Sequence, residues 1–171
     1  GNISDRRAGR ISSEEAMPIV ERLKAIQIPG VDVEIRHVKE YRFAVNMRGE
    51  GVLPDLEETD PQKTGVPPLQ VVAKKPEAQR TADLYNQWVT EARKILASEP
   101  KANCLTLRGF ATDPALPSYQ DKYALKAACV AVYPMYRGLS QLVGMDVQSF
   151  PGDQPADELA AGQNIWGDYD F

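Results

Sequence analysis

Residues 31–48 read VDVEIRHVKEYRFAVNMR. Apolar side chains occupy every second position from 31 to 35 and again from 41 to 47, with polar or charged residues at most of the positions between them. A period of two is typical of strands with one buried face. With a tight turn at Lys39-Glu40, this stretch predicts a β-hairpin whose second strand ends at Arg48-Gly49.

Helices are predicted on both sides of the hairpin. Ser12 and Glu15 have capping-box spacing and precede apolar residues at helical intervals, which predicts a helix over about 13–27. A second and stronger helix is predicted from Pro76 or Glu77 to about Ser98, since both residues suit a first turn and Pro100 lies just beyond the end. Its apolar face contains Thr81, Tyr85, Trp88, Val89, Ala92, Ile95 and Leu96.

The remaining segments complete an α+β pattern. Residues 50–68 read as a long loop, and an extended segment is expected at 69–75, strands at 103–107, 124–132 and 145–150, and a helix at 134–144. Mixed strands and helices of this kind predict a two-layer sandwich, with a mixed four- to five-stranded sheet and helices packed mainly on one face. The length favours a single domain over 1–171.

Composition excludes several classes of partner. The formal net charge is −4, which disfavours nucleic acid or an anionic membrane. No apolar run approaches a membrane span, and the arginine-rich start does not resemble a signal peptide. We therefore expect a cytoplasmic protein, with Cys104 and Cys129 as buried free thiols.

Cationic side chains gather at three glycine-containing turns. They are Arg6, Arg7 and Arg10 before the first helix, Arg48 after the hairpin and Arg108 after the predicted strand 103–107. Guanidinium groups are permanently charged, forked donors for phosphate or carboxylate oxygens, and adjacent glycine lets backbone N–H groups approach the same anion. These residues predict a binding site for a small anionic ligand.

The sequence lacks the residues that would turn this anion-binding site into a catalytic site. The chain has one histidine, His37, no nucleophile beside a base, and no cluster of metal-ligating residues, so neither catalytic residues nor a metal site are predicted. Asp60 orients an arginine, accepts a hydrogen bond from a substrate hydroxyl, or simply starts the turn at Asp60-Pro61. Lys126 either points to solvent or reaches into the site.

Seven motifs, in order along the chain, resemble one family, the archaeal-type cofactor-independent (2,3-bisphosphoglycerate-independent) phosphoglycerate mutases. They are DRRAGR at 5–10, RGEGVLP at 48–54, TDP at 59–61, PEAQRTA at 76–82, LRG at 107–109, KYALKAAC at 122–129 and GMDV at 144–147. The resemblance is to the domain that these enzymes insert into an alkaline-phosphatase-like metal domain. It implies that both ends of the chain are cut, with 1–11 and 155–171 as linkers to the missing metal-binding domain.

The resemblance also implies a function. Enzymes of this family are isomerases of glycolysis and gluconeogenesis that interconvert 2- and 3-phosphoglycerate. Their metal domain supplies a serine that takes the phosphoryl group and two divalent metals (manganese, magnesium or zinc). The insert would then be a substrate-binding lid, inactive alone, in which Arg6, Arg7, Arg10, Arg48, Arg108 and Lys126 hold phosphoglycerate and Asp60 orients them.

The chain departs from the family pattern in three places, one of which is a shortened basic loop before Asn103. Gln62 follows Asp-Pro where the familiar form has histidine, and Phe110-Ala111 follow Arg-Gly where it has small residues. Two alternatives stay open. One is a free-standing α+β domain that binds a small phosphorylated ligand, and the other is the insert of a related phosphatase or phosphoryl-transfer enzyme.

Overall fold

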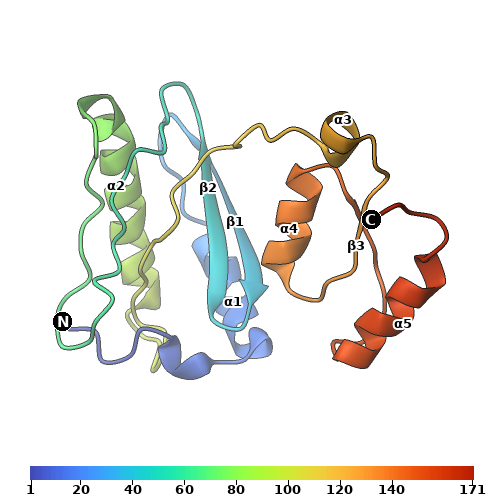
Figure 1. Ribbon diagram of the computed structural model, residues 1–171. Coiled ribbons are helices and arrows are strands. Elements are labelled where there is room, and N and C mark those ends of the chain that lie inside the picture. The colour runs from blue at the N-terminus through green and yellow to red at the C-terminus, as the bar shows by residue number, and fades with distance from the viewer. The chain divides into compact units, whose positions relative to one another are not determined.

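The computed structural model describes residues 1–171, which form two compact units, Gly1–Thr112 and Asp113–Phe171 (Figure 1). The prediction of a single domain over 1–171 differs from this division. The physical reason lies in the hydrophobic core of the first unit, whose buried members all lie at or before Leu107. Residues 111–117, which follow it, are exposed to solvent.

The predicted hairpin is confirmed. Strands β1 (Asp32–Lys39) and β2 (Arg42–Arg48) pair in antiparallel fashion, from Asp32 opposite Arg48 to Lys39 opposite Arg42. Glu40 in the turn adopts a left-handed backbone conformation (φ 52°). One face of the hairpin is polar and exposed, and the other contributes Ile35 and Met47 to the core.

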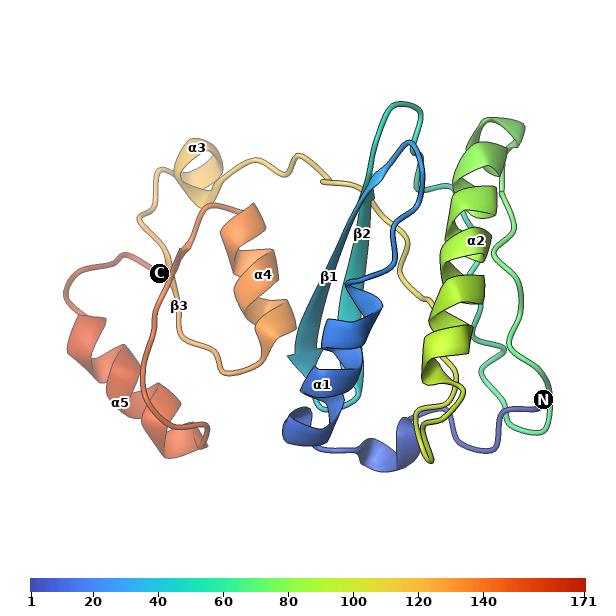
Figure 2. The same cartoon turned by 180° about the vertical axis from the view of Figure 1, so that it is seen from behind.

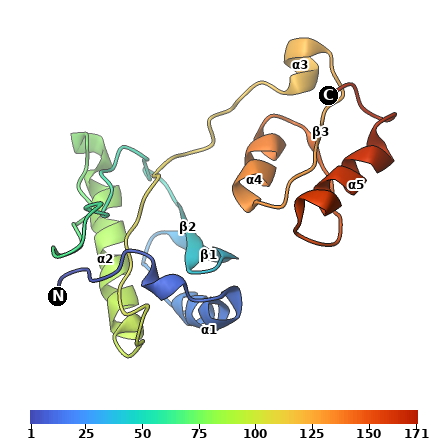
Figure 3. The same cartoon turned by 60° about the horizontal axis from the view of Figure 1, so that its bottom comes forward.

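Helix α1 (Ser13–Leu23) begins with the predicted capping box. The Ser12 hydroxyl accepts from the Glu15 N–H at 3.2 Å, and the Glu15 carboxylate accepts from the Ser12 N–H at 2.8 Å. The helix ends four residues earlier than predicted, because the chain tightens into a turn in which the Ile26 N–H bonds to the Leu23 carbonyl. Figures 2 and 3 show α1 beside the hairpin.

The longest helix, α2 (Gln79–Leu96), follows the short 3₁₀ helix η2 (Pro76–Ala78) and matches the prediction closely. Its apolar face is buried, and Trp88 is completely enclosed, with its ring 6.2 Å from that of Phe43 on β2. This helix therefore covers the apolar face of the hairpin and provides a larger share of the core than any other element.

A four- to five-stranded sheet is not observed. Instead, the first unit contains the β1–β2 pair and the second contains a parallel pair, β3 (Ala128–Cys129) with β4 (Asp146–Val147). Residues 103–107 form no strand. Their hydrogen bonds to the loop near Thr59 involve Leu107 alone and do not continue as a β-ladder. The segment 69–75 contributes one isolated bridge, between Leu56 and Ala73.

The second unit contains three helices: α3 (Tyr119–Tyr123), α4 (Pro134–Leu142) and α5 (Pro155–Ile165). Helix α4 was predicted. Helix α5 was not, since the prediction for 155–171 is a linker. Pro155 lies in its first turn, and the Asp157 carboxylate accepts from the Gln154 N–H at 3.0 Å, so these two residues start the helix.

The C-terminal residues run beside β3. The Asp170 N–H donates to the Lys126 carbonyl and the Ala128 N–H donates to the Phe171 carbonyl, each at 2.8 Å. Residues 169–171 are not a regular strand, but they lie where a third strand of this small sheet would lie.

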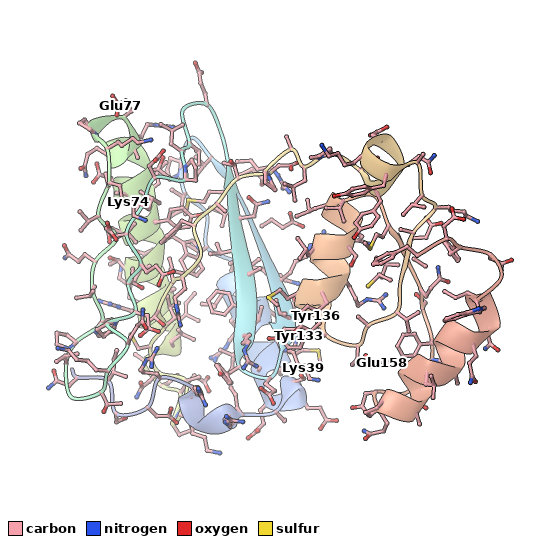
Figure 4. All side chains as sticks on the ribbon, in the orientation of Figure 1. Lys39, Lys74, Glu77, Tyr133, Tyr136 and Glu158 are labelled. Carbon is pink, nitrogen blue, oxygen red and sulfur yellow. The ribbon has the colours of Figure 1, made fainter.

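The second unit buries few large apolar side chains. Its only buried apolar residues are Ala127 and Ala131, whereas Tyr136 on α4 is 55% exposed. Figure 4 labels Tyr136 and its ring neighbour Tyr133 at the start of α4, and Glu158 on α5, whose carboxylate accepts from the Val132 N–H.

Cys104 in the first unit is exposed and Cys129 in the second is half-buried, so the prediction that both are buried is wrong. No helix combines the length and hydropathy needed to span a membrane.

Candidate functional site

A buried carboxylate, Asp60, forms the centre of the candidate site. Its side chain is 5% exposed and accepts two hydrogen bonds from Arg6, at 2.9 Å from Nε and 2.6 Å from a terminal nitrogen. The Gln62 N–H donates a third at 2.9 Å. Paired donation by one guanidinium fixes the orientation of both groups.

The second arginine of the site is Arg108. One of its terminal nitrogens lies 3.5 Å from an Asp60 oxygen, and its Nε donates to the Glu58 carboxylate at 3.3 Å. The other Glu58 oxygen accepts from the Gly109 N–H at 3.1 Å. We call Arg6, Glu58, Asp60 and Arg108 the Asp60 cluster.

The backbone around Thr59 brings these distant residues together. The Thr59 N–H donates to the Leu107 carbonyl at 2.9 Å, and the Thr59 hydroxyl accepts from the Leu107 N–H at 2.6 Å. Both residues are buried. This link holds Arg108, which follows Leu107, against Asp60, which follows Thr59.

Arg6 is positioned by its own turn. The Asp5 carboxylate accepts from the backbone N–H groups of Arg7 and Gly9, at 2.7 and 2.6 Å, and these bonds lower its pKa. They close the turn that leads into the 3₁₀ helix η1 (Ala8–Arg10). Arg6 therefore projects toward Asp60 from an ordered turn.

Electrostatics in the cluster favour the charged forms. The hydrogen bonds from Arg6 hold the pKa of Asp60 below its ordinary value, with smaller contributions from the Gln62 N–H and the charge of Arg108. The same pairing raises the pKa of Arg6. The pairing of Arg6 with Asp60 thus stabilises the charged forms of both groups.

The other predicted cations lie elsewhere. Arg7 and Arg10 are exposed and form no ion pair. Arg48 leaves β2 with an exposed side chain and donates to Glu34 at 3.0 Å, in an open groove along β1 that Lys24 and Arg36 also line. Arg36 and then Arg48 lower the pKa of Glu34.

Lys126 belongs to the second unit. Its ammonium group lies over the Tyr169 ring, 4.4 Å from the centroid. The Tyr169 hydroxyl in turn donates to Asp146 at 3.1 Å. Within its own unit, Lys126 is therefore an exposed cation held by an aromatic ring.

Sequence reasoning missed several supporting residues. Glu58, Thr59 and Asp5 take part through contacts with residues distant in sequence or with backbone groups. Arg80 on α2 donates to the Glu50 carbonyl, and so holds the glycine-rich turn that follows Arg48. Only Asp5 had a local signal, an aspartate just before a short turn.

No group of three or more His, Cys, Asp or Glu side chains is arranged to hold a metal ion. The divalent metals implied by the resemblance therefore have no ligand set among these residues. What the cluster offers is a pair of guanidinium groups and an approachable backbone N–H, which suit an anion rather than a cation.

Comparison with known proteins identifies relatives. The family model described as 2,3-bisphosphoglycerate-independent phosphoglycerate mutase matches residues 1–102. Proteins named "Probable 2,3-bisphosphoglycerate-independent phosphoglycerate mutase" from Deinococcus radiodurans and Aquifex aeolicus are 44% and 39% identical, each over 99% of this chain. The chain spans 43% of the length of each of these two relatives.

A solved structure agrees. The cofactor-independent phosphoglycerate mutase from Thermoplasma acidophilum superposes with a TM-score of 0.69 at 27% identity, covering 100% of this chain and 49% of that one. The fold, the matched family model and these relatives lead to one conclusion: the chain belongs to the 2,3-bisphosphoglycerate-independent phosphoglycerate mutase family.

Proposed function

We propose that this chain is the substrate-binding part of a longer phosphoglycerate mutase that interconverts 2-phosphoglycerate and 3-phosphoglycerate. The relatives carry that enzyme's name over polypeptides more than twice as long as the matched region. Within this chain, the Asp60 cluster is the part that recognises the negatively charged groups of the substrate.

The observation that carries this proposal is the arrangement around Asp60. The Asp60 carboxylate, which is 5% exposed, binds Arg6 and contacts Arg108. These two arginines lie near the beginning and the end of the sequence of the first unit. Both guanidinium groups remain partly open to solvent, at 31% and 52% side-chain exposure. Fixed cations of this kind are suited to hold a carboxylate or phosphoryl group during a reaction.

The chemical step is assigned to the rest of the longer polypeptide. A serine there takes the phosphoryl group from one hydroxyl of glycerate and returns it to the other, and the metals belong to that part too. The residues described above bind and orient: Arg6 and Arg108 retain the glycerate carboxylate or the phosphoryl oxygens while the acid turns between the two transfers. Arg7, Arg10, Arg48 and Lys126 are proposed as further cations of the closed lid.

The test compares the longer polypeptide with the 171-residue chain. We expect the longer polypeptide to convert 3-phosphoglycerate to 2-phosphoglycerate, with little hydrolysis of other phosphomonoesters, and the 171-residue chain to show no turnover. Turnover by the 171-residue chain alone would contradict the assignment of chemistry to the rest of the protein. Faster hydrolysis of other phosphomonoesters would favour a phosphatase.

A further inference from the structure

Glu58 occupies two hydrogen-bond donors that an anionic ligand would otherwise find free. Its carboxylate bridges the Arg108 Nε at 3.3 Å and the Gly109 N–H at 3.1 Å. The two donors come from adjacent residues and face one carboxylate. A side-chain donor beside a backbone N–H is a common way for proteins to bind one carboxylate or phosphate group.

The local backbone leaves this site accessible. Gly109 has φ of 69°, a left-handed conformation that favours glycine, and apart from its two chain neighbours no residue has an atom within 4 Å of the position where a Cβ would stand. The Arg108 side chain is 52% exposed and that of Glu58 37% exposed. A small anion can therefore approach both donors from solvent.

Charge balance indicates which carboxylate leaves when an anion binds. Arg6 and Arg108 are offset by Glu58 and Asp60, so the formal charges of the cluster sum to zero while Glu58 is in place. Asp60 is buried and accepts three hydrogen bonds, whereas Glu58 is half-buried and accepts two. Moving Glu58 into water costs less, and it leaves the cluster with a net charge of +1.

We propose that Glu58 is an internal competitor for an anion subsite formed by the Arg108 Nε and the Gly109 N–H. A carboxylate or phosphate group of the ligand replaces the Glu58 carboxylate on these two donors, and Glu58 turns toward water. This inference rests on the proposed function only for the identity of the natural ligand, because any phosphate or carboxylate group fits the same two donors.

The test uses the 171-residue chain and inorganic phosphate, followed by ¹⁵N NMR of the Gly109 amide and the Arg108 Nε–H. In the wild type we expect weak, saturable shifts of both signals. In Glu58→Gln, and more clearly in Glu58→Ala, we expect the Kd for phosphate to fall about three- to tenfold. In the wild type the Glu58 carboxylate occupies both donors for much of the time, and in the variants a larger fraction of the molecules has these donors free to bind phosphate.

The matched control is Glu57→Gln. Glu57 is the exposed neighbour of Glu58. Replacing it with glutamine changes the net charge of the chain as much as Glu58→Gln does, but leaves the carboxylate that binds Arg108 and Gly109 in place. We expect its Kd to equal that of the wild type. The proposal is overturned if phosphate leaves both signals unshifted, if the Glu58 variants bind phosphate more weakly, or if Glu57→Gln tightens binding as much as Glu58→Gln.

These outcomes separate the subsite from the proposed function. Tighter phosphate binding by the Glu58 variants would support the subsite even if the longer polypeptide had no mutase activity. Mutase activity with unchanged phosphate affinity in the variants would support the function and reject the competitor.

Discussion

Replacing Asp60 with asparagine removes the negative charge at the centre of the cluster and leaves the side-chain volume almost unchanged. The amide oxygen of asparagine can still accept from the Gln62 N–H, but it cannot offer two carboxylate oxygens to Arg6. Hydrogen bonds to charged groups contribute about 1.5–3 kcal/mol each. Because the Arg6 side chain is 31% exposed, water replaces part of the loss. We expect the free energy of unfolding of the first unit to fall by about 1–2 kcal/mol near neutral pH.

The effect should depend on pH with a definite sign. The pKa of Asp60 in the folded chain lies below its ordinary value of 3.8, so its stabilising contribution is complete above that value. The contribution is lost as the pH falls through the lower, folded-state pKa. The difference between the wild type and Asp60→Asn should therefore be constant near neutrality and shrink in acid.

Urea unfolding followed by tryptophan fluorescence measures this difference. Trp88 is buried in the first unit and Trp166 is 85% exposed in the second, so a Trp166→Phe background reports on the first unit alone. With a slope of about 2 kcal/mol per molar urea, the unfolding midpoint should fall by about 0.5–1 M. Glu91→Gln, which breaks an exposed ion pair with Lys94, is the control and should shift it much less. Equal midpoints for Asp60→Asn and the wild type, or a difference that persists unchanged in acid, would refute the reasoning.

Three further predictions concern how the first unit is held together. Thr59→Val leaves the buried Leu107 N–H without its acceptor and should lower the free energy of unfolding, measured by urea titration, by about 1–3 kcal/mol. Thr59→Ser keeps the hydroxyl and should therefore be nearly as stable as the wild type. Ser12→Ala removes the helix cap and should cost about 1 kcal/mol, measured by circular dichroism in urea; no change would mean that the cap is not formed in solution. Residues 1–112 alone should unfold cooperatively, and residues 113–171 alone should not, because the first unit contains all the large buried apolar side chains; a cooperative transition in 113–171 would contradict this.

The elements that sequence predicted well are those fixed by local patterns. The hairpin follows from a period of two and the helix over Gln79–Leu96 from an apolar face bounded by prolines. The capping box at Ser12 is a contact between residues three apart. In each case the decisive interactions connect neighbours in sequence, and no tertiary information is needed.

The errors arise where distant contacts override local preference. Residues 103–107 have a strand-like composition, but their backbone is satisfied by Thr59 rather than by a neighbouring strand. Helix α5 lacks an apolar face, so periodicity did not indicate it, although Pro155 and Asp157 supplied start signals. The expected single sheet failed because each two-stranded pair lies in its own unit.

The candidate site was predictable in part. Arginines beside small residues identified Arg6 and Arg108 individually, and the turn residue Asp60 was considered as an orienter. That these three meet depends on the link between Thr59 and Leu107, which no local pattern encodes. Glu58 had no signal at all, since an acidic residue in a loop is ordinary in sequence.

The most direct test of the account is the kcat/KM for 3-phosphoglycerate of Arg108→Ala in the longer polypeptide, measured beside Arg93→Ala, an exposed arginine of α2 away from the cluster. Loss of a charge-assisted contact to the substrate predicts a decrease of about ten- to a hundredfold for Arg108→Ala and little change for Arg93→Ala. Wild-type kinetics in the folded Arg108→Ala enzyme would contradict the claim that the Asp60 cluster holds the substrate.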